Sequence, residues 1–264
     1  MDIVGKSKAR PRELELRPEL GPELGDAPKN AAVFGSSGGI GAALCDALVR
    51  GGCKTVYAGS RSGAGPNDPA IRPFAFDLTD ENSIAAAAAA MKDDPPDLVI
   101  VATGILTLSD GTGPERTYKR MDPAAMAEVL ALNTIGPALI AKHIMPLMPR
   151  GRRSVFAALS ARVGSISDNG LGGWHSYRAS KAALNMLIKN FALEMARTHK
   201  DSVIAGLHPG TVDSALSQPF QSNLPGGQLM EPSAAAQNLL NVLAQLGPQH
   251  SGQVFDFAGK VVPA

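Results

Sequence analysis

From residue 30 onward the chain alternates short apolar segments with longer helical stretches, and this alternation limits its possible folds more than any other feature. The apolar segments have strand length and are hydrophobic throughout, as expected for strands covered on both faces. They lie at residues 31–35, 55–59, 71–76, 98–102, 154–159, 203–207 and 254–257. The helical stretches are residues 40–50, 83–91, 123–145, 177–198 and 232–246. The pattern predicts an α/β fold with a doubly wound, mainly parallel, seven-stranded sheet and helices on both faces.

Residues 1–29 differ from the rest, because they are rich in proline, glycine and charge and offer no face for a core. We therefore predict a flexible N-terminal arm over 1–29 and one domain over 30–264. The formal net charge of +1 argues against a nucleic-acid partner or a membrane surface, and the apolar runs are too short to span a bilayer. The first residues hold no apolar core of a secretory signal, and we expect a cytoplasmic protein.

A glycine-rich turn follows the first predicted strand and leads directly into the first helix. It comprises Gly35, Ser36, Ser37, Gly38, Gly39, Ile40 and Gly41. Such a turn lets the backbone approach a pyrophosphate, and it directs the positive end of the helix at the anion. Glycine-rich turns are common, but this one lies in the first strand–helix–strand unit, which is the context of a Rossmann dinucleotide site.

The ends of the second and third strands indicate which nucleotide is bound. An NAD site usually has a carboxylate after the second strand, whereas this chain has Ser60 and Arg61, which suit a 2′-phosphate. We therefore favour NADP over NAD; the alternative is that Arg61 is only a solvated loop cation. Asp77, followed by Leu78, has two compatible interpretations: it binds the adenine amino group, or it caps the helix that begins near Asp80.

Tyr177 and Lys181 are four residues apart on a predicted helix and so share one face. A free phenol is a poor base at neutral pH, and a neighbouring ammonium is expected to lower its pKa for proton transfer. Ser160 follows a predicted core strand, and Asn133 lies in a helix that Gly136 and Pro137 interrupt. Each of these residues alone has an ordinary structural interpretation, and no histidine or cysteine spacing indicates a metal site.

Taken together, these motifs resemble the classical short-chain dehydrogenase/reductase (SDR) family, and within it the C-factor-like branch. The resemblance covers about residues 30–262 and includes His208-Pro-Gly-Thr-Val212 and Gly172-Gly-Trp-His-Ser-Tyr-Arg-Ala-Ser-Lys181. Two positions depart from the family pattern. Phe34 stands where the family usually has threonine, and Val101-Ala-Thr-Gly104 stands where it has Asn-Asn-Ala-Gly. The second change removes asparagine amides near the cofactor, and Thr103 is a partial substitute.

The resemblance implies a role for each motif residue. Tyr177 would be the acid/base, Lys181 would tune the phenol and bind the ribose, Ser160 would bind the substrate oxygen, and Asn133 would hold a relay water. Nucleotide contacts would come from Ala102, Thr103, Gly104, Pro209, Gly210, Thr211 and Val212. The resemblance also implies a homodimer or homotetramer paired through the helices 123–145 and 177–198.

The function predicted on this basis is NADPH-dependent reduction of a small-molecule carbonyl, or the reverse oxidation of an alcohol. Leu216, Phe220, Leu224 and Met230 in the segment 214–230 suggest that the substrate has an apolar portion. Trp174 has two equally weighted interpretations, as a pocket residue or as an interface residue. The alternative function is a nucleotide-binding regulatory or signalling protein of the same fold, with weak or no turnover.

Overall fold

The computed structural model describes residues 28–223 and 227–264, and the arm expected over 1–29 lies outside them except for its last two residues. The central sheet has seven strands in the order β3-β2-β1-β4-β5-β6-β9, and every neighbouring pair is parallel. This confirms the predicted doubly wound α/β sheet. Its strands are β1 (Asn30–Phe34), β2 (Thr55–Ser60), β3 (Ile71–Ala75), β4 (Leu98–Val101), β5 (Ser154–Leu159), β6 (Ser202–His208) and β9 (Gln253–Asp256).

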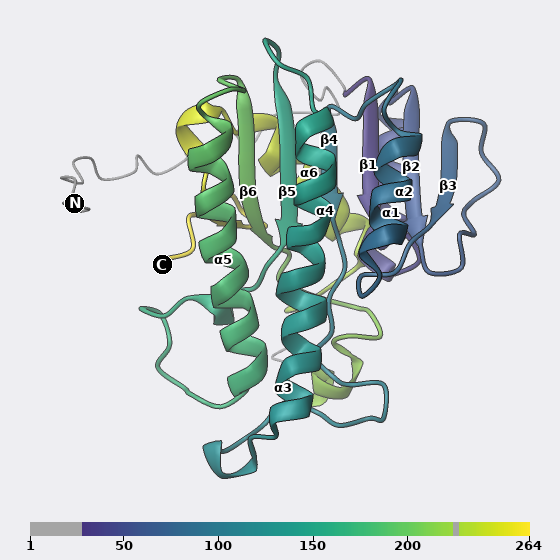
Figure 1. Ribbon diagram of the computed structural model, residues 1–264. Helices are drawn as coiled ribbons and strands as arrows, with labels where there is room; N and C mark the ends of the chain where they lie inside the picture. Colours follow the sequence, from purple (N-terminus) through teal and green to yellow (C-terminus); the bar gives the residue numbers. More distant parts are fainter. Residues whose placement is uncertain (1–27, 224–226) are drawn as a thin grey trace.

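Helices cover both faces of the sheet (Figure 1). On one face lie α1 (Gly39–Arg50) and α6 (Pro232–Gln245); on the other lie α2 (Glu81–Ala90), α4 (Gly136–Ile144) and α5 (His175–Met195). The helix α3 (Pro123–Leu130) leads into α4. Asp80 and Asp122 cap α2 and α3 by accepting hydrogen bonds from Asn82 N (3.0 Å) and Ala125 N (2.8 Å). Short 3-10 helices are η1 (Tyr118–Arg120), η3 (Met145–Leu147), η4 (Arg162–Gly164), η5 (Gln218–Asn223) and η6 (Pro248–His250).

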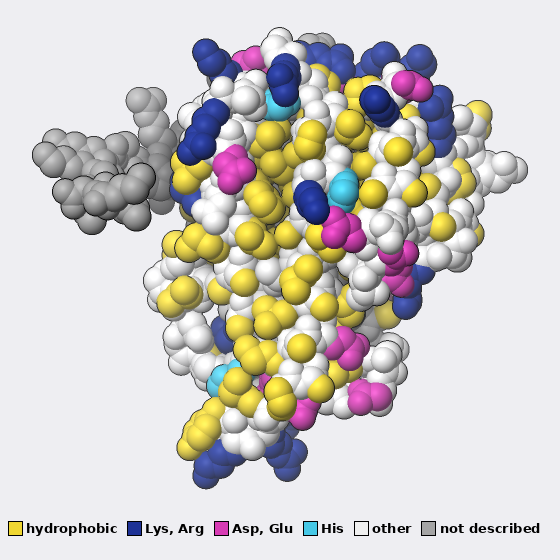
Figure 2. Space-filling model, in the orientation of Figure 1, with side chains coloured by type: hydrophobic (Ala, Val, Ile, Leu, Met, Phe, Trp, Pro, Cys, Tyr) yellow, Lys and Arg dark blue, Asp and Glu magenta, His cyan; other side chains and the backbone are white. Residues whose placement is uncertain are grey.

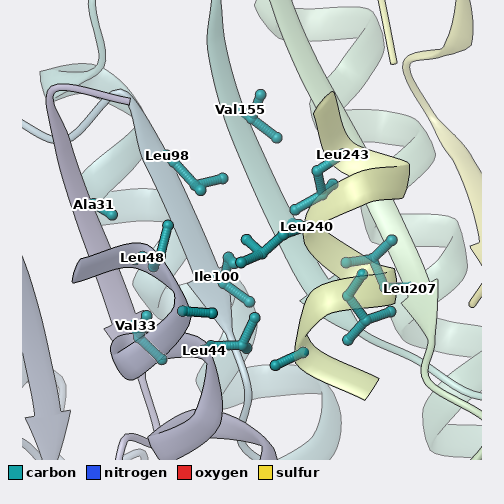
Figure 3. Packing of buried hydrophobic residues seen from close by; sticks show 14 of the residues in the cluster. Ala31, Val33, Leu44, Leu48, Leu98, Ile100, Val155, Leu207, Leu240 and Leu243 are labelled. Atoms are coloured by element: carbon teal, nitrogen blue, oxygen red, sulfur yellow. The ribbon is translucent and has the colours of Figure 1, made fainter. Parts of the chain in front are cut away.

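Alternate side chains of each inner strand are buried on opposite faces of the sheet, which explains why the strands are apolar throughout. Val33 and Ile100 pack toward α1 and α6, where Leu44 and Leu240 meet them (Figure 3). Their strand neighbours, such as Phe34 and Val101, belong to the cluster on the α2, α4 and α5 face.

Phe34 forms the centre of an aromatic group under the second face. Its ring makes edge contacts with Phe74 and Phe76, with centroids 5.3 and 5.1 Å away. A Cβ at Gly59 would lie 2.4 Å from the ring of Phe74, so the neighbouring strand must have glycine there. The phenylalanine that departs from the family pattern is therefore a fully buried core residue.

The long predicted helix 123–145 is interrupted in the structure. A π-helical turn, η2 (Ala131–Ile135), joins α3 to α4 and contains Asn133, which agrees with the kink expected there. The run Pro123–Leu147 contains an 18-residue window with a mean hydropathy of 1.5, and it is long and apolar enough to cross a bilayer by length and composition. Ile140 and Ile144 from this run are fully buried against the sheet, which accounts for part of its apolar composition.

The sequence patterns missed a second, two-stranded sheet. It pairs β7 (Thr211–Val212) with β8 (Leu229–Met230) and fixes the chain after β6. Hydrophobic side chains are also exposed over the outward faces of the helices in Figure 2, including Ile135, Met186 and Leu193. These lie on the helices expected to pair between subunits, and that pairing stays a prediction.

We predict that Phe34→Ala lowers the free energy of unfolding by about 3–5 kcal/mol, because it leaves a cavity between Phe74 and Phe76. Urea unfolding followed by circular dichroism measures the change. Tyr118→Ala is the control, since that ring is 68% exposed and its removal should change stability by less than about 0.5 kcal/mol. Equal effects of the two substitutions would contradict the packing described above.

Candidate functional site

The predicted nucleotide loop lies where β1 ends and α1 begins, at the edge formed by the carboxyl ends of the parallel strands. Gly35 has a φ of +100°, a conformation that favours glycine. A Cβ at Gly41 would lie 2.0 Å from the carbonyl oxygen of Gly35, so only glycine allows the turn to close. Ser36 faces inward instead, and its hydroxyl donates to Gly59 O at 3.0 Å.

The N-terminus of α1 is open to a ligand. Gly38 is its N-cap and supplies no side-chain hydrogen bond to the first amides. Ser37, Gly38 and Gly39 are exposed, while Ile40 is half-buried against the core. Unpaired amides at a helix N-terminus bind anions, so this turn has the geometry that a pyrophosphate requires.

The ends of β2 and β3 lie beside this turn. The Ser60 hydroxyl is buried and donates to Ala64 O at 3.1 Å, so it shapes the loop after β2. Arg61 is exposed and takes part in no ion pair among the described residues. Asp77 accepts hydrogen bonds from Thr79 N (2.8 Å) and Thr79 Oγ1 (2.7 Å), which hold the pKa of its carboxyl below the usual value.

Asp77 therefore has a local structural role before α2, and its binding to adenine stays a prediction. Leu78 packs against the π-helical turn, because its side chain occupies the space where a Cβ at Gly136 would lie.

The altered segment after β4 reaches both the glycine turn and α5. Ala102 N donates to Phe34 O at 2.8 Å, which continues the pairing of β4 with β1. The Thr103 methyl lies 2.9 Å from where a Cβ of Gly35 would be, and its buried hydroxyl has no hydrogen-bond partner. A Cβ at Gly104 would lie 3.1 Å from Asn133 Oδ1 and 3.4 Å from Lys181 Nζ. At Gly104 the backbone therefore lies close to Asn133 and Lys181. The Thr103 hydroxyl has no partner among the described residues.

Asn133 fixes this segment to α5. Its amide pairs with the backbone of Ile105 in both directions, at 2.8 and 2.9 Å, and its Nδ2 also donates to Ser180 Oγ at 3.2 Å. The neighbouring Thr134 hydroxyl donates to Ser180 O at 2.8 Å. Since the amide makes these protein contacts, its observed role is to position the chain, and the expected relay water stays a prediction.

Tyr177 and Lys181 occupy adjacent turns of α5 and are both buried. The Lys181 Nζ lies 5.8 Å from the centroid of the Tyr177 ring and donates to Leu159 O at 2.8 Å. Burial raises the pKa of Tyr177 to about 12 and lowers the pKa of Lys181 to about 8. The expected lowering of the phenol pKa by the ammonium is therefore wrong for this structure, because the loss of water around the buried phenol has the larger effect.

Ser160 and Ala161 follow β5 and have different neighbours on α5. The Ser160 hydroxyl donates to Asn185 Oδ1 at 2.6 Å, and Asn185 is eight residues after Tyr177 on α5, a rise of about 12 Å. Successive side chains of extended backbone point to opposite sides, and Ala161 accordingly lies in a small buried cluster with Leu106 and Tyr177. This arrangement gives the Ser160 hydroxyl a partner within the protein and places a methyl group near Tyr177. Binding of the substrate oxygen by Ser160 stays a prediction.

The segment after β6 closes the nucleotide side of the site. Gly210 has a φ of +77°, and its missing Cβ would lie 3.0 Å from the ring of Phe257. Pro209 and Thr211 are half-buried and Val212 is buried. Asp213 O and Ser214 lie within 3.7 Å of where a Cβ of Gly39 would be, so the chain just after this segment lies beside the glycine turn. Contacts of residues 209–212 with the nucleotide stay a prediction.

A cavity of about 700 Å³ opens beside Tyr177. The loop between β4 and α3 supplies most of its wall, including Leu106, and Phe220 closes it from η5. Trp174 packs at 5.2 Å from Phe220 and 6.2 Å from Tyr177, ring centroid to centroid, but it does not itself line the cavity, so its pocket and interface interpretations both stay predictions. Leu224, from the apolar set expected over 214–230, lies outside the described residues.

Glu115 from the same loop holds the start of α5 in place. Its carboxylate accepts hydrogen bonds from the Ser176 amide (3.1 Å) and hydroxyl, and its backbone oxygen accepts from Trp174 N at 2.5 Å. Trp174 has a φ of +51°, a left-handed conformation unusual for a large side chain. Glu115 was not singled out from the sequence, since no local pattern links it to a helix that begins 60 residues later.

Comparisons with known proteins agree with this geometry. Residues 29–225 match the model of the short chain dehydrogenase family. The C-signal protein of Myxococcus xanthus is 32% identical over 143 residues, which cover 54% of this chain and 81% of the relative, and it supports the C-factor-like resemblance. The 1-hydroxy-2-glutathionyl-2-methyl-3-butene dehydrogenase of Rhodococcus sp. (strain AD45) is 33% identical over 181 residues, 67% of this chain and 73% of the relative.

A solved structure with a similar fold is the NADPH-bound carbonyl reductase from chicken fatty liver. Its TM-score is 0.77 with 25% sequence identity, and the match covers 89% of this chain and 94% of the reductase. The family match covers well over half of the chain, and the seven-stranded parallel sheet is the fold that the resemblance implied. The chain therefore belongs to the short-chain dehydrogenase family of oxidoreductases.

Proposed function

We propose that this protein reduces the carbonyl group of a small molecule with NADPH, or catalyses the reverse oxidation of an alcohol. The observation that carries the proposal is the position of Tyr177, which lines a cavity of about 700 Å³ while Lys181 lies beneath its ring. The nucleotide turn lies at the same edge of the sheet. Substrate and nucleotide would therefore meet at the phenol.

The protonation state of Tyr177 supports reduction as the direction of the reaction. With a pKa raised to about 12 by burial, the phenol stays protonated at neutral pH and can donate its proton to a carbonyl oxygen. NADPH, when bound, supplies the hydride. Lys181 holds a positive charge below its pKa of about 8, and that charge stabilises the phenolate that remains after proton transfer.

The residues at the nucleotide turn fit a dinucleotide with a 2′-phosphate. The open N-terminus of α1 offers backbone amides to the pyrophosphate, and the exposed Arg61 offers a guanidinium at the end of β2. The buried Thr103 hydroxyl would gain a partner from the nucleotide. The chicken carbonyl reductase of similar fold has NADPH bound, which supports the same choice here.

One observation favours a second function, a nucleotide-binding regulatory protein with weak turnover. Ala161 lies near Tyr177 and Ser160 is bonded to Asn185, so no serine hydroxyl from the end of β5 assists the phenol. The similarity to the C-signal protein points in the same direction. We rank this function second, because the chain still has the buried Tyr177–Lys181 pair beside a cavity, which a protein that only binds nucleotide would not need.

We expect Tyr177→Phe to lower kcat for NADPH-dependent carbonyl reduction by about 10²–10⁴-fold, the usual contribution of a positioned acid. Nucleotide absorbance measures turnover against a panel of aldehydes and ketones, and NADPH fluorescence measures binding, which should be unchanged. Tyr118→Phe, at an exposed tyrosine, is the control. Undiminished turnover by the Tyr177 variant would exclude the phenol as the acid.

We expect Arg61→Ala to weaken NADPH binding by roughly ten- to a hundredfold, the effect of losing a charged hydrogen bond, and to leave NADH binding nearly unchanged. Fluorescence titration with both nucleotides measures the two dissociation constants. Lys54→Ala removes a charge at the opposite end of the same strand and serves as the control. Parallel weakening of both nucleotides would show that Arg61 does not contact the 2′-phosphate.

We expect Ala161→Ser to raise kcat for carbonyl reduction by up to roughly tenfold, since a serine hydroxyl there would donate a second hydrogen bond to the reacting oxygen. Ser160→Ala should leave kcat nearly unchanged and lower the free energy of unfolding by about 1 kcal/mol through loss of the bond to Asn185. Steady-state kinetics and urea unfolding measure both effects. A folded Ser160→Ala protein without turnover would contradict the assignment of these two positions.

A further inference from the structure

The wall of the cavity beside Tyr177 carries four charged residues, two of each sign: Glu115, Arg116, Arg120 and Asp122. The formal charges of these four residues sum to zero. Their side chains differ in bonding, however, and this difference decides which charge a ligand in the cavity meets.

Both carboxylates accept hydrogen bonds from groups at helix N-termini. Glu115 accepts hydrogen bonds from the Ser176 amide and hydroxyl at the start of α5, and Asp122 accepts from Ala125 N at the start of α3. Burial opposes the ionisation of Glu115, but the bonds from Ser176 outweigh it and hold its pKa below the usual value. The positive ends of two helix dipoles therefore offset part of the two negative charges.

The two arginines differ from the carboxylates in their bonding. Within residues 28–223 and 227–264, neither side chain takes part in the ion pairs or the side-chain hydrogen bonds of the protein. Arg120 is the last residue of the short helix η1 and Arg116 lies two residues before it; both are exposed and line the cavity. Two guanidinium groups therefore lie on one cavity without forming an ion pair to a carboxylate of the described residues.

The same cavity is also lined by apolar side chains, among them Leu106, Val129 and Phe220, and by Tyr177. We propose that the site takes a ligand with an apolar body and an anionic group, a carboxylate in the simplest case, which Arg116 and Arg120 bind. The planar fork of guanidinium donors matches a carboxylate, and a partly desolvated pair of this kind is stronger than a neutral hydrogen bond. The inference rests on the proposed reduction, because the carbonyl of such a ligand would lie at Tyr177.

Ligand binding can be measured without turnover. Trp174 is the only tryptophan in the sequence and packs against Phe220 and Tyr177, which both line the cavity, so its fluorescence reports on occupancy. The probes are octanoate and octanamide, which share a chain and differ in charge. We expect octanoate to bind at least roughly tenfold more tightly than octanamide, and high salt to reduce that ratio.

The matched variants locate the effect. Arg116→Gln combined with Arg120→Gln should abolish the preference for octanoate and leave octanamide binding unchanged. Lys119→Gln removes a charge from the same loop at a position that does not line the cavity, and should retain the preference. Equal affinities for the two probes, no binding of either, or a preference that survives the double variant would each overturn the inference.

Reduction of octanal by NADPH tests the proposed function separately, because that substrate has no charge. Turnover of octanal without any preference for octanoate would leave the reductase standing and refute the anionic ligand. Tight octanoate binding without reduction of any aldehyde would support the anionic site and contradict carbonyl reduction.

Discussion

The central sheet is parallel and buried on both faces, and this constraint determines where the chain can carry polar chemistry. Alternate side chains of β1, β4 and β5 pack toward opposite helix layers, so the strand interiors have no room for charged groups. Polar and glycine residues therefore gather where the strands end. The glycine turn follows β1, the segment around Gly104 follows β4, and the Ser160–Ala161 pair follows β5.

A single buried amide links the segment after β4 to α5, the helix that carries Tyr177 and Lys181. Asn133 pairs with both backbone atoms of Ile105 and with Ser180, and it can do so because the π-helical turn directs its side chain inward. A helix interrupted at that point is costly by itself, but it joins the loop that walls the cavity to the helix that carries Tyr177. Glu115 makes the second connection, from the same loop to the start of α5.

The site combines retained and altered parts of the family pattern. Tyr177 and Lys181 are buried together next to an open cavity, while the end of β5 presents Ala161 where a hydroxyl would assist the phenol. Burial keeps the phenol protonated, which suits an acid in reduction. Arg116 and Arg120 on the cavity wall form no ion pair among the described residues, whereas the neighbouring carboxylates accept hydrogen bonds from helix ends.

The sequence by itself determined the order of strands and helices, the glycine turn and the Tyr177–Lys181 pair, because these depend on hydrophobic period and local spacing. It also predicted the break near Asn133, since Gly136 and Pro137 are local signals. Only the tertiary structure decided the rest. Whether Ser160 or Ala161 lies near Tyr177 depends on the register of β5 against α5, and the capping of α5 by Glu115 joins residues about 60 positions apart. Contacts across such distances depend on how the helices pack on the sheet, which no local pattern of residues encodes.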